Sequence, residues 1–124
     1  MNLSIEKLVF VYNAHSGILN MALDAAHKVF SPKTYPCKLC ELTYGAVSER
    51  NVWKSFRKAN NTPFEFLHID EFEEQFTGYI PETVTYPIVF SWSGNLLTEF
   101  ISAQEMNGLT SVDELIALVE ERIA

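Results

Sequence analysis

The first apolar segment of the chain is a short continuous run at residues 8–12 (LVFVY), which ends in the polar residues 13–17 (NAHSG). A run of this length that is rich in Val and aromatic side chains is typical of a strand buried on both faces. From Ile18 the apolar positions recur with a helical period as far as Phe30, and a proline follows at position 32. We therefore expect a central strand, then an amphipathic helix with a wide apolar face.

The middle of the chain alternates between irregular and periodic patterns. Residues 31–48 carry two prolines and a glycine without a sustained period, which predicts a long loop with a short helical turn over residues 38–43. Helical spacing returns over residues 48–59, and the aromatic, β-prone residues 64–69 predict a second strand. Asp70 and Glu73 have the spacing of an N-cap and its reciprocal partner, so a short helix is expected to begin there.

The last third of the chain predicts a hairpin and a final helix. Residues 86–90 and 96–101 are the expected strands, joined by a turn at residues 91–95. Ser102 and Gly108 bracket one helical turn. Ser111 and Glu114 form a capping-box pattern that opens a helix over residues 112–123.

This order of elements predicts an α/β fold in a single domain spanning residues 1–124. A strand joined through helices to a second strand favours a parallel crossover, whereas the two strands of a hairpin must be antiparallel. We therefore expect a mixed central sheet of roughly four strands, with helices on both faces.

The element order resembles the thioredoxin-like fold, with one local match at Tyr86 and Pro87, where the hairpin opens. In thioredoxins the proline at this place is cis and faces a redox C-x-x-C that directly follows the first strand. Residues 15–18 (HSGI) occupy the position after the first strand here. The resemblance implies that Tyr86 and Pro87 contact the backbone of a substrate.

Composition and charge limit the classes of partner that the protein is expected to bind. The chain has 9 Lys and Arg against 16 Asp and Glu, a net charge of −7 and a pI near 4.8, so we expect no nucleic-acid partner. The N-terminus lacks a basic n-region, and the apolar run at residues 8–12 is shorter than the roughly 20 residues of a membrane span. We expect a cytoplasmic protein that does not bind a membrane. Its expected partner is an unknown protein or small molecule.

Cys37 and Cys40 are the only cysteines and form one C-x-x-C motif. In a reducing compartment this spacing favours redox chemistry, in which one thiolate attacks a disulfide and the second resolves the product. A metal site is the second interpretation, although a closed zinc site needs four ligands and the motif supplies two. The third is structural, with two small side chains packing the loop against the core. The sequence assigns no cofactor and no metal ligand.

Three motifs together resemble a group of small bacterial proteins of no established activity. The first strand ends in residues 13–17 (NAHSG), the cysteine loop has the form Y-x-C-x-L-C-x-L-T-x-G over residues 35–45, and residues 67–72 read LHIDEF. The resemblance implies common descent and a shared loop.

His15 is a candidate binding residue, because ligands of α/β sheets lie at the carboxyl ends of strands, near helix N-termini. The alternative is that Ser16 caps the helix and His15 is solvated. His27 is expected on a solvated helix face, and His68 is expected either in the core or at the polar end of a strand.

Two functions remain open. The first is thiol–disulfide exchange or redox sensing, with Cys37 and Cys40 as the exchanging pair. The second is a non-catalytic binding or interaction domain with a structural or metal-holding loop, whose apolar contacts are residues Tyr35, Leu39, Leu42 and Tyr44.

The place of the cysteines separates these functions. Exchange of the thioredoxin kind requires the loop to return beside Pro87 and the His15 turn. Packing at the far end of the first helix, near His27 and Phe30, would exclude exchange at that place. We favour the far end, because Pro32 stands only five residues before Cys37.

Overall fold

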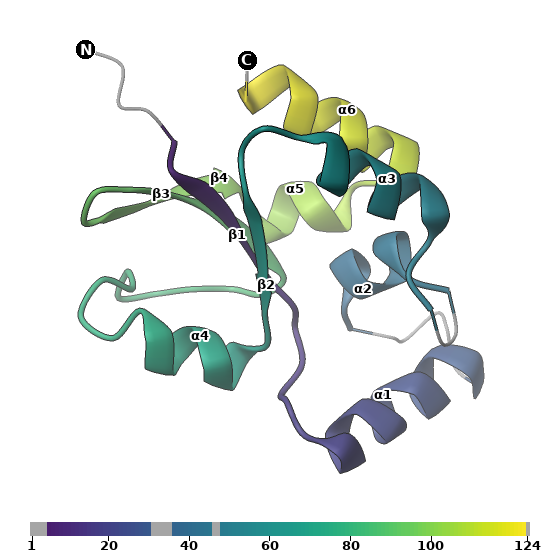
Figure 1. The fold of residues 1–124 in the computed structure, drawn as a ribbon. Helices are drawn as coiled ribbons and strands as arrows, with labels where there is room; N and C mark the ends of the chain where they lie inside the picture. The colour runs from purple at the N-terminus through teal and green to yellow at the C-terminus, as the bar shows by residue number, and fades with distance from the viewer. Residues whose placement is uncertain (1–4, 31–35, 46–47, 124) are drawn as a thin grey trace.

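The computed structural model of the chain describes residues 5–30, 36–45 and 48–123 (Figure 1). In this part of the chain, strands and helices follow one another in the order that the sequence predicts. They are, in chain order, β1 (Lys7–Val11), α1 (Ile18–Phe30), α2 (Lys38–Thr43), α3 (Asn51–Ala59), β2 (Phe64–Leu67), α4 (Ile69–Gln75), β3 (Ile88–Ser93), β4 (Leu96–Ile101), α5 (Ala103–Asn107) and α6 (Val112–Ile123).

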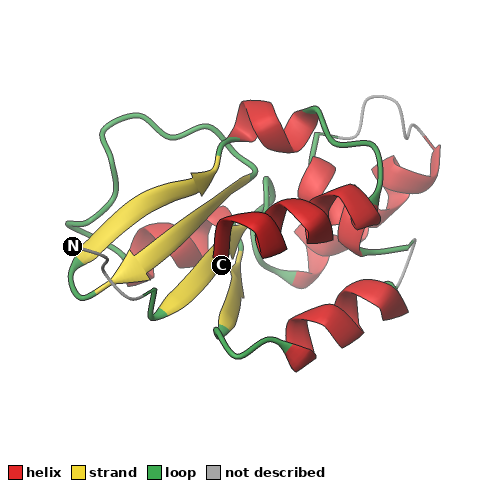
Figure 2. Ribbon diagram, turned by 90° about the horizontal axis from the view of Figure 1, so that it is seen from above, coloured by secondary structure: helices red, strands yellow, loops and turns green. Residues whose placement is uncertain are grey.

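The strands form one mixed sheet in the order β2-β1-β3-β4. β1 pairs in parallel with β2 and antiparallel with β3, and β3 and β4 form an antiparallel hairpin. The expectations of a mixed sheet and of a central first strand are therefore confirmed. Figure 2 shows the open, twisted sheet with helices arranged around it.

Both faces of β1 are buried because each face is covered by helices. Its alternate residues Leu8 and Phe10 enter a core shared with α2, α3, α5 and α6. Val9 and Val11 point the other way, into a second core with Phe72 of α4. A continuous apolar run is what such a two-sided position requires. Helices lie on both sides of the sheet, as expected (Figure 1).

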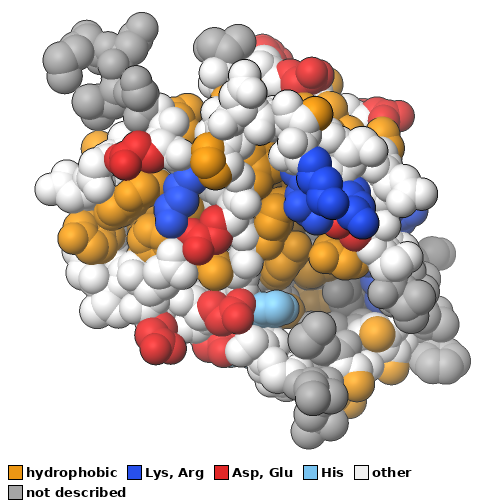
Figure 3. All heavy atoms as spheres, viewed as in Figure 1, with side chains coloured by type: hydrophobic (Ala, Val, Ile, Leu, Met, Phe, Trp, Pro, Cys, Tyr) orange, Lys and Arg blue, Asp and Glu red, His pale blue; other side chains and the backbone are white. Residues whose placement is uncertain are grey.

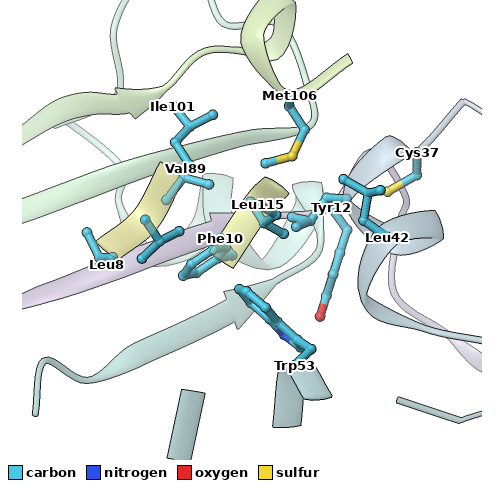
Figure 4. Packing of buried hydrophobic residues seen from close by; sticks show 12 residues of the cluster. Leu8, Phe10, Tyr12, Cys37, Leu42, Trp53, Val89, Ile101, Met106 and Leu115 are labelled. Carbon is cyan, nitrogen blue, oxygen red and sulfur yellow. The ribbon is translucent and has the colours of Figure 1, made fainter. Parts of the chain in front are cut away.

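Trp53 of α3 is the largest side chain of the first core and is fully buried. Its ring packs edge-on against Phe10, with 5.5 Å between the ring centroids (Figure 4). It also packs edge-on against Phe66, with 6.2 Å between the ring centroids. Its Nε1 has no hydrogen-bond partner among the described residues. Shape and burial therefore hold this indole in place.

Two boundaries differ from the sequence predictions by three residues. β3 continues to Ser93, which pairs with Leu96, so the turn is shorter than predicted and contains Gly94 in a left-handed conformation (φ +65°). α3 begins at Asn51, three residues later than expected. Glu49 instead forms an isolated bridge with Tyr44, and extended pairing prevents that residue from joining the helix.

The start of α4 also differs from the prediction. The N-cap is His68, not Asp70, and the carboxylate of Glu71 accepts the backbone N–H of His68 at 2.8 Å. Asp70 does not cap this helix, and its carboxylate accepts hydrogen bonds from Ser16 instead.

Of the two later caps, Ser102 and Glu105 form a reciprocal capping box. At the second, Ser111 Oγ accepts the backbone N–H of Glu114 at 3.2 Å, but the Glu114 carboxylate accepts the backbone N–H of Thr110.

Candidate functional site

Three segments that are distant in the sequence meet at the end of the sheet where β1 and β2 finish (Figure 1). The backbone N–H of Asn13 donates to Cys37 Sγ at 3.3 Å, and Asn13 Nδ2 donates to the carbonyl of Pro36 at 3.0 Å. The backbone N–H of Ile69 donates to the carbonyl of Ala14 at 2.9 Å. The segments joined here carry the three motifs noted in the sequence. We call this region the cysteine end.

Cys37 and Cys40 are joined as a disulfide, with their Cα atoms 5.3 Å apart. Cys37 is the N-cap of α2, and its Sγ accepts the backbone N–H of Cys40 at 3.2 Å. The residue is 1% exposed, whereas Cys40 is only partly buried. Lys38, which lies between them, is 3.6 Å from the Glu41 carboxylate. The cation nearest in sequence is therefore paired, and the polar partners of Cys37 Sγ are backbone N–H groups.

The expectation that the cysteine loop packs at the far end of α1 holds for Cys40, whose carbonyl accepts a hydrogen bond from Lys28 in the last turn of α1, but not for Cys37. Cys37 returns to Asn13, the second residue after β1. The prediction treated α1 as a spacer that carries the chain away, but residues 31–36 can span most of the roughly 20 Å length of that helix at about 3.3 Å per residue. Side-chain and backbone groups of Asn13 then hold the returning chain.

The other end of α2 is held by cations. Lys28 Nζ donates to the carbonyls of Cys40 at 2.9 Å and Tyr44 at 2.8 Å, and Arg50 donates to the carbonyl of Glu41 at 3.1 Å. The Cys40 carbonyl also accepts the backbone N–H of Tyr44, and all three carbonyls lie in or just after the last turn of α2, where cations interact favourably with the helix. Burial, and then the charge of Arg50, lowers the pKa of Lys28. The cysteine helix is thus fixed at both ends by residues outside it.

Tyr12 forms the inner wall of the cysteine end (Figure 4). Its ring lies 6.4 Å from that of Tyr44 and 5.5 Å from that of His68, centroid to centroid. Burial, with a smaller effect from Tyr44, raises the pKa of Tyr12 well above its usual range. The sequence analysis missed this residue as a site component. The sequence feature that could have identified Tyr12 is its position as the last residue of the apolar run, where the hydroxyl of an aromatic side chain can reach the end of the sheet.

Basic side chains border the site on the α3 side, where Figure 3 shows a group of Lys and Arg above a hydrophobic surface. Arg57 donates two hydrogen bonds to the carboxylate of Glu49, from Nε at 2.6 Å and from Nη2 at 2.7 Å. These bonds lower the pKa of Glu49. Because Glu49 pairs with Tyr44, the two-pronged contact fixes the chain that leaves α2.

Asp70 connects the turn before α1 to the first turn of α4. Its carboxylate accepts the backbone N–H of Ser16 at 2.8 Å and also the Ser16 hydroxyl. These hydrogen bonds lower the pKa of Asp70 to about 2. The Ser16 hydroxyl therefore binds another element, whereas the sequence suggested that it caps its own helix. His15 is exposed on the same turn.

The Tyr86–Pro87 peptide bond is cis, and Pro87 is buried. Val11 pairs with Ile88, so the proline comes just before the strand residue opposite the end of β1. The ring of Tyr86 packs against Phe72 at 6.3 Å, in the core on the α4 face. Cys37 belongs to the core on the opposite face. The structure thus separates the Tyr86 ring from the disulfide, while both segments lie at the same end of the sheet.

The contacts expected for a structural cysteine loop are also present in part. Leu39 and Leu42 are buried in the first core and Tyr44 packs against it, whereas Tyr35 lies outside the described residues. Within residues 5–30, 36–45 and 48–123, no group of three or more His, Cys, Asp or Glu side chains is arranged to hold a metal ion. His27 lies on α1 and His68 at the start of α4, on separate elements.

The chain matched no protein-family model, no curated protein and no solved structure in comparisons with each. Among the helices of the described residues, none combines the length and the apolar composition that crossing a membrane requires.

Proposed function

We propose that this protein carries out thiol–disulfide exchange, or senses redox state, through Cys37 and Cys40 in the cytoplasm. The observation that carries the proposal is the pair of backbone N–H groups, from Asn13 and Cys40, that donate to Cys37 Sγ. Hydrogen bonds to a sulfur favour its thiolate over its thiol, which lowers the pKa. A sulfur stabilised in this way is a good leaving group in exchange.

A thioredoxin-like assignment of the fold is part of the proposal. It is supported by the strand order β2-β1-β3-β4, by the parallel first pair and by the cis bond before Pro87. The contact between Asn13 and Cys37 supports it further. If α1 is regarded as an insertion after β1, the helix that begins at Cys37 takes the place that the C-x-x-C helix has after the first strand of thioredoxins.

The two sulfurs have different roles in the proposed reaction. An incoming thiolate attacks Sγ of Cys40, the less buried residue, and forms a mixed disulfide. The bond between the two cysteines breaks, and its electron pair stays on Cys37 as a thiolate held by the two N–H donors. A second external thiolate then attacks the external sulfur, which releases Cys40 as a thiolate and an external disulfide. The pair gains the two electrons that the external thiols lose.

Single cysteine variants test these roles with oxidised glutathione as the probe. We expect the Cys37→Ser protein, which keeps the accessible Cys40, to form a mixed disulfide at least about tenfold faster than the Cys40→Ser protein. Each variant is the matched control for the other, and both are checked for folding by circular dichroism. The role assignment is wrong if the Cys40→Ser protein reacts equally fast or faster.

The second candidate is a binding domain whose cysteine loop is structural. The observation in its favour is the 1% exposure of Cys37 beside Leu39 and Leu42 in the core. This candidate predicts that neither single variant forms a mixed disulfide while folded, and that reduction loosens α2. The same glutathione experiment therefore distinguishes the two functions.

A further inference from the structure

A cavity of about 850 Å³ lies on the α4 face of the sheet, between the chain that leads into β3 and helix α5. Phe90 in its floor also packs against α4, where the ring of Phe72 stacks on it with 5.4 Å between the ring centroids. The volume of the cavity lies within the roughly 300–1,000 Å³ typical of small-molecule sites. No residue of the cysteine pair lines it.

The lining of the cavity combines an apolar floor with a polar rim. Val84, Ile88 and Phe90 supply apolar surface, and the rim carries the side-chain amides of Gln104 and Asn107. Residues Ile88 and Phe90 belong to the second core and are nearly fully buried, so the floor is fixed by packing. A floor of this kind suits a short hydrocarbon chain.

Glu99 is the single charged residue among those that line the cavity. It pairs with Phe90 across the hairpin and follows the buried Leu97 by two positions, so it lies on the cavity face of β4. Its carboxylate has no hydrogen bond or ion pair within the described residues. An unpaired carboxylate beside apolar surface attracts a cation that also carries an apolar group.

We propose that this cavity binds an aliphatic primary amine, with the ammonium group on Glu99 and the hydrocarbon chain on Val84, Ile88 and Phe90. The ammonium group has three N–H donors, and the carbonyl oxygens of the Gln104 and Asn107 amides are acceptors within the same lining. The net charge of −7 adds a long-range attraction for cations and repels anions. This inference is independent of the proposed exchange reaction.

The test is isothermal titration of the full-length protein with 1,5-diaminopentane. Glu99→Gln is expected to weaken binding at least about tenfold, because it replaces a charge-assisted contact with a neutral one. Glu120→Gln, an exposed carboxylate of α6 outside the cavity, removes the same charge and is expected to leave affinity unchanged. Unfolding midpoints of both variants verify that they fold.

Two further ligands test whether the positive charge is required and whether the amine belongs to a free molecule or to a lysine side chain. The neutral analogue 1,5-pentanediol is expected to bind at least about tenfold more weakly than the diamine. The amide of Nα-acetyl-lysine tests the other source of the same chemistry: equal affinity for it would assign the cavity to lysine side chains of a peptide. Equal weakening in Glu99→Gln and Glu120→Gln, or no detectable binding of any amine, would overturn the proposal.

Discussion

The cysteine end and the C-terminal region of the molecule are held together in different ways. In the C-terminal region, residues that are close in sequence pair with each other, as in the β3–β4 hairpin and in the capping box between Ser102 and Glu105. At the cysteine end, Asn13 binds Cys37 across 24 positions and Ser16 binds Asp70 across 54. The hairpin and the capping box are therefore specified by near neighbours, whereas the contacts of the cysteine end form only when separate elements have assembled.

The largest effect is expected where the cysteine end depends on the core. Trp53→Ala removes a fully buried indole from beneath α3 and should lower the free energy of unfolding by about 3–5 kcal/mol. Urea denaturation measures this loss. Trp53→Phe is the matched control and should cost about half as much, because it keeps a ring and removes an N–H without a partner. A Phe variant as unstable as the Ala variant would contradict this account.

Two serine substitutions compare the regions directly. Ser102→Ala removes the N-cap of α5 and should lower the free energy of unfolding by about 1 kcal/mol. Ser16→Ala should change global stability less, because the lost hydroxyl contact with Asp70 is exposed, yet it should speed amide exchange at the start of α1. Hydrogen exchange followed by NMR checks both. Equal exchange rates at α1 in the parent and Ser16→Ala would show that the contact does not hold the turn.

The smallest expected effect is the pH dependence of the Ser16–Asp70 contact. The pKa of Asp70 falls from 3.8 to about 2, so its contribution to stability is fully present above about pH 4 and is lost as the pH falls through about 2. NMR titration of the carboxyl group measures the midpoint. In Ser16→Ala the midpoint should rise toward 3.8, because the hydroxyl is the largest cause of the shift. An unchanged midpoint in this variant would remove that assignment.

The difference between the regions also explains what could be predicted from the sequence. The order of elements, the central place of β1 and the caps at Ser102 and Ser111 follow from apolar period and local capping patterns, and the structure contains them. These features depend on neighbours a few positions away. Local patterns therefore sufficed for most of the fold.

The arrangement of the candidate site could not be obtained in this way. The return of Cys37 to Asn13 depends on how α1 packs, and the partner of Asp70 lies on another element. Local spacing made Asp70 an N-cap because Glu73 lies three residues later, but the N-cap is His68, two residues earlier, and the helix begins at Ile69. Tertiary contacts decided both positions, and no periodicity encodes them.

The central claim is that Cys37 and Cys40 form a reversible pair in which the reduced form is stabilised by N–H donors to Cys37. The most direct measurement is equilibration of the protein in glutathione buffers of graded potential, followed by thiol labelling, mass spectrometry and circular dichroism. We predict a two-electron transition between about −120 and −270 mV, the range of exchange proteins, with the same fold in both states. A transition below about −300 mV, or unfolding on reduction, would show a structural disulfide and contradict the claim.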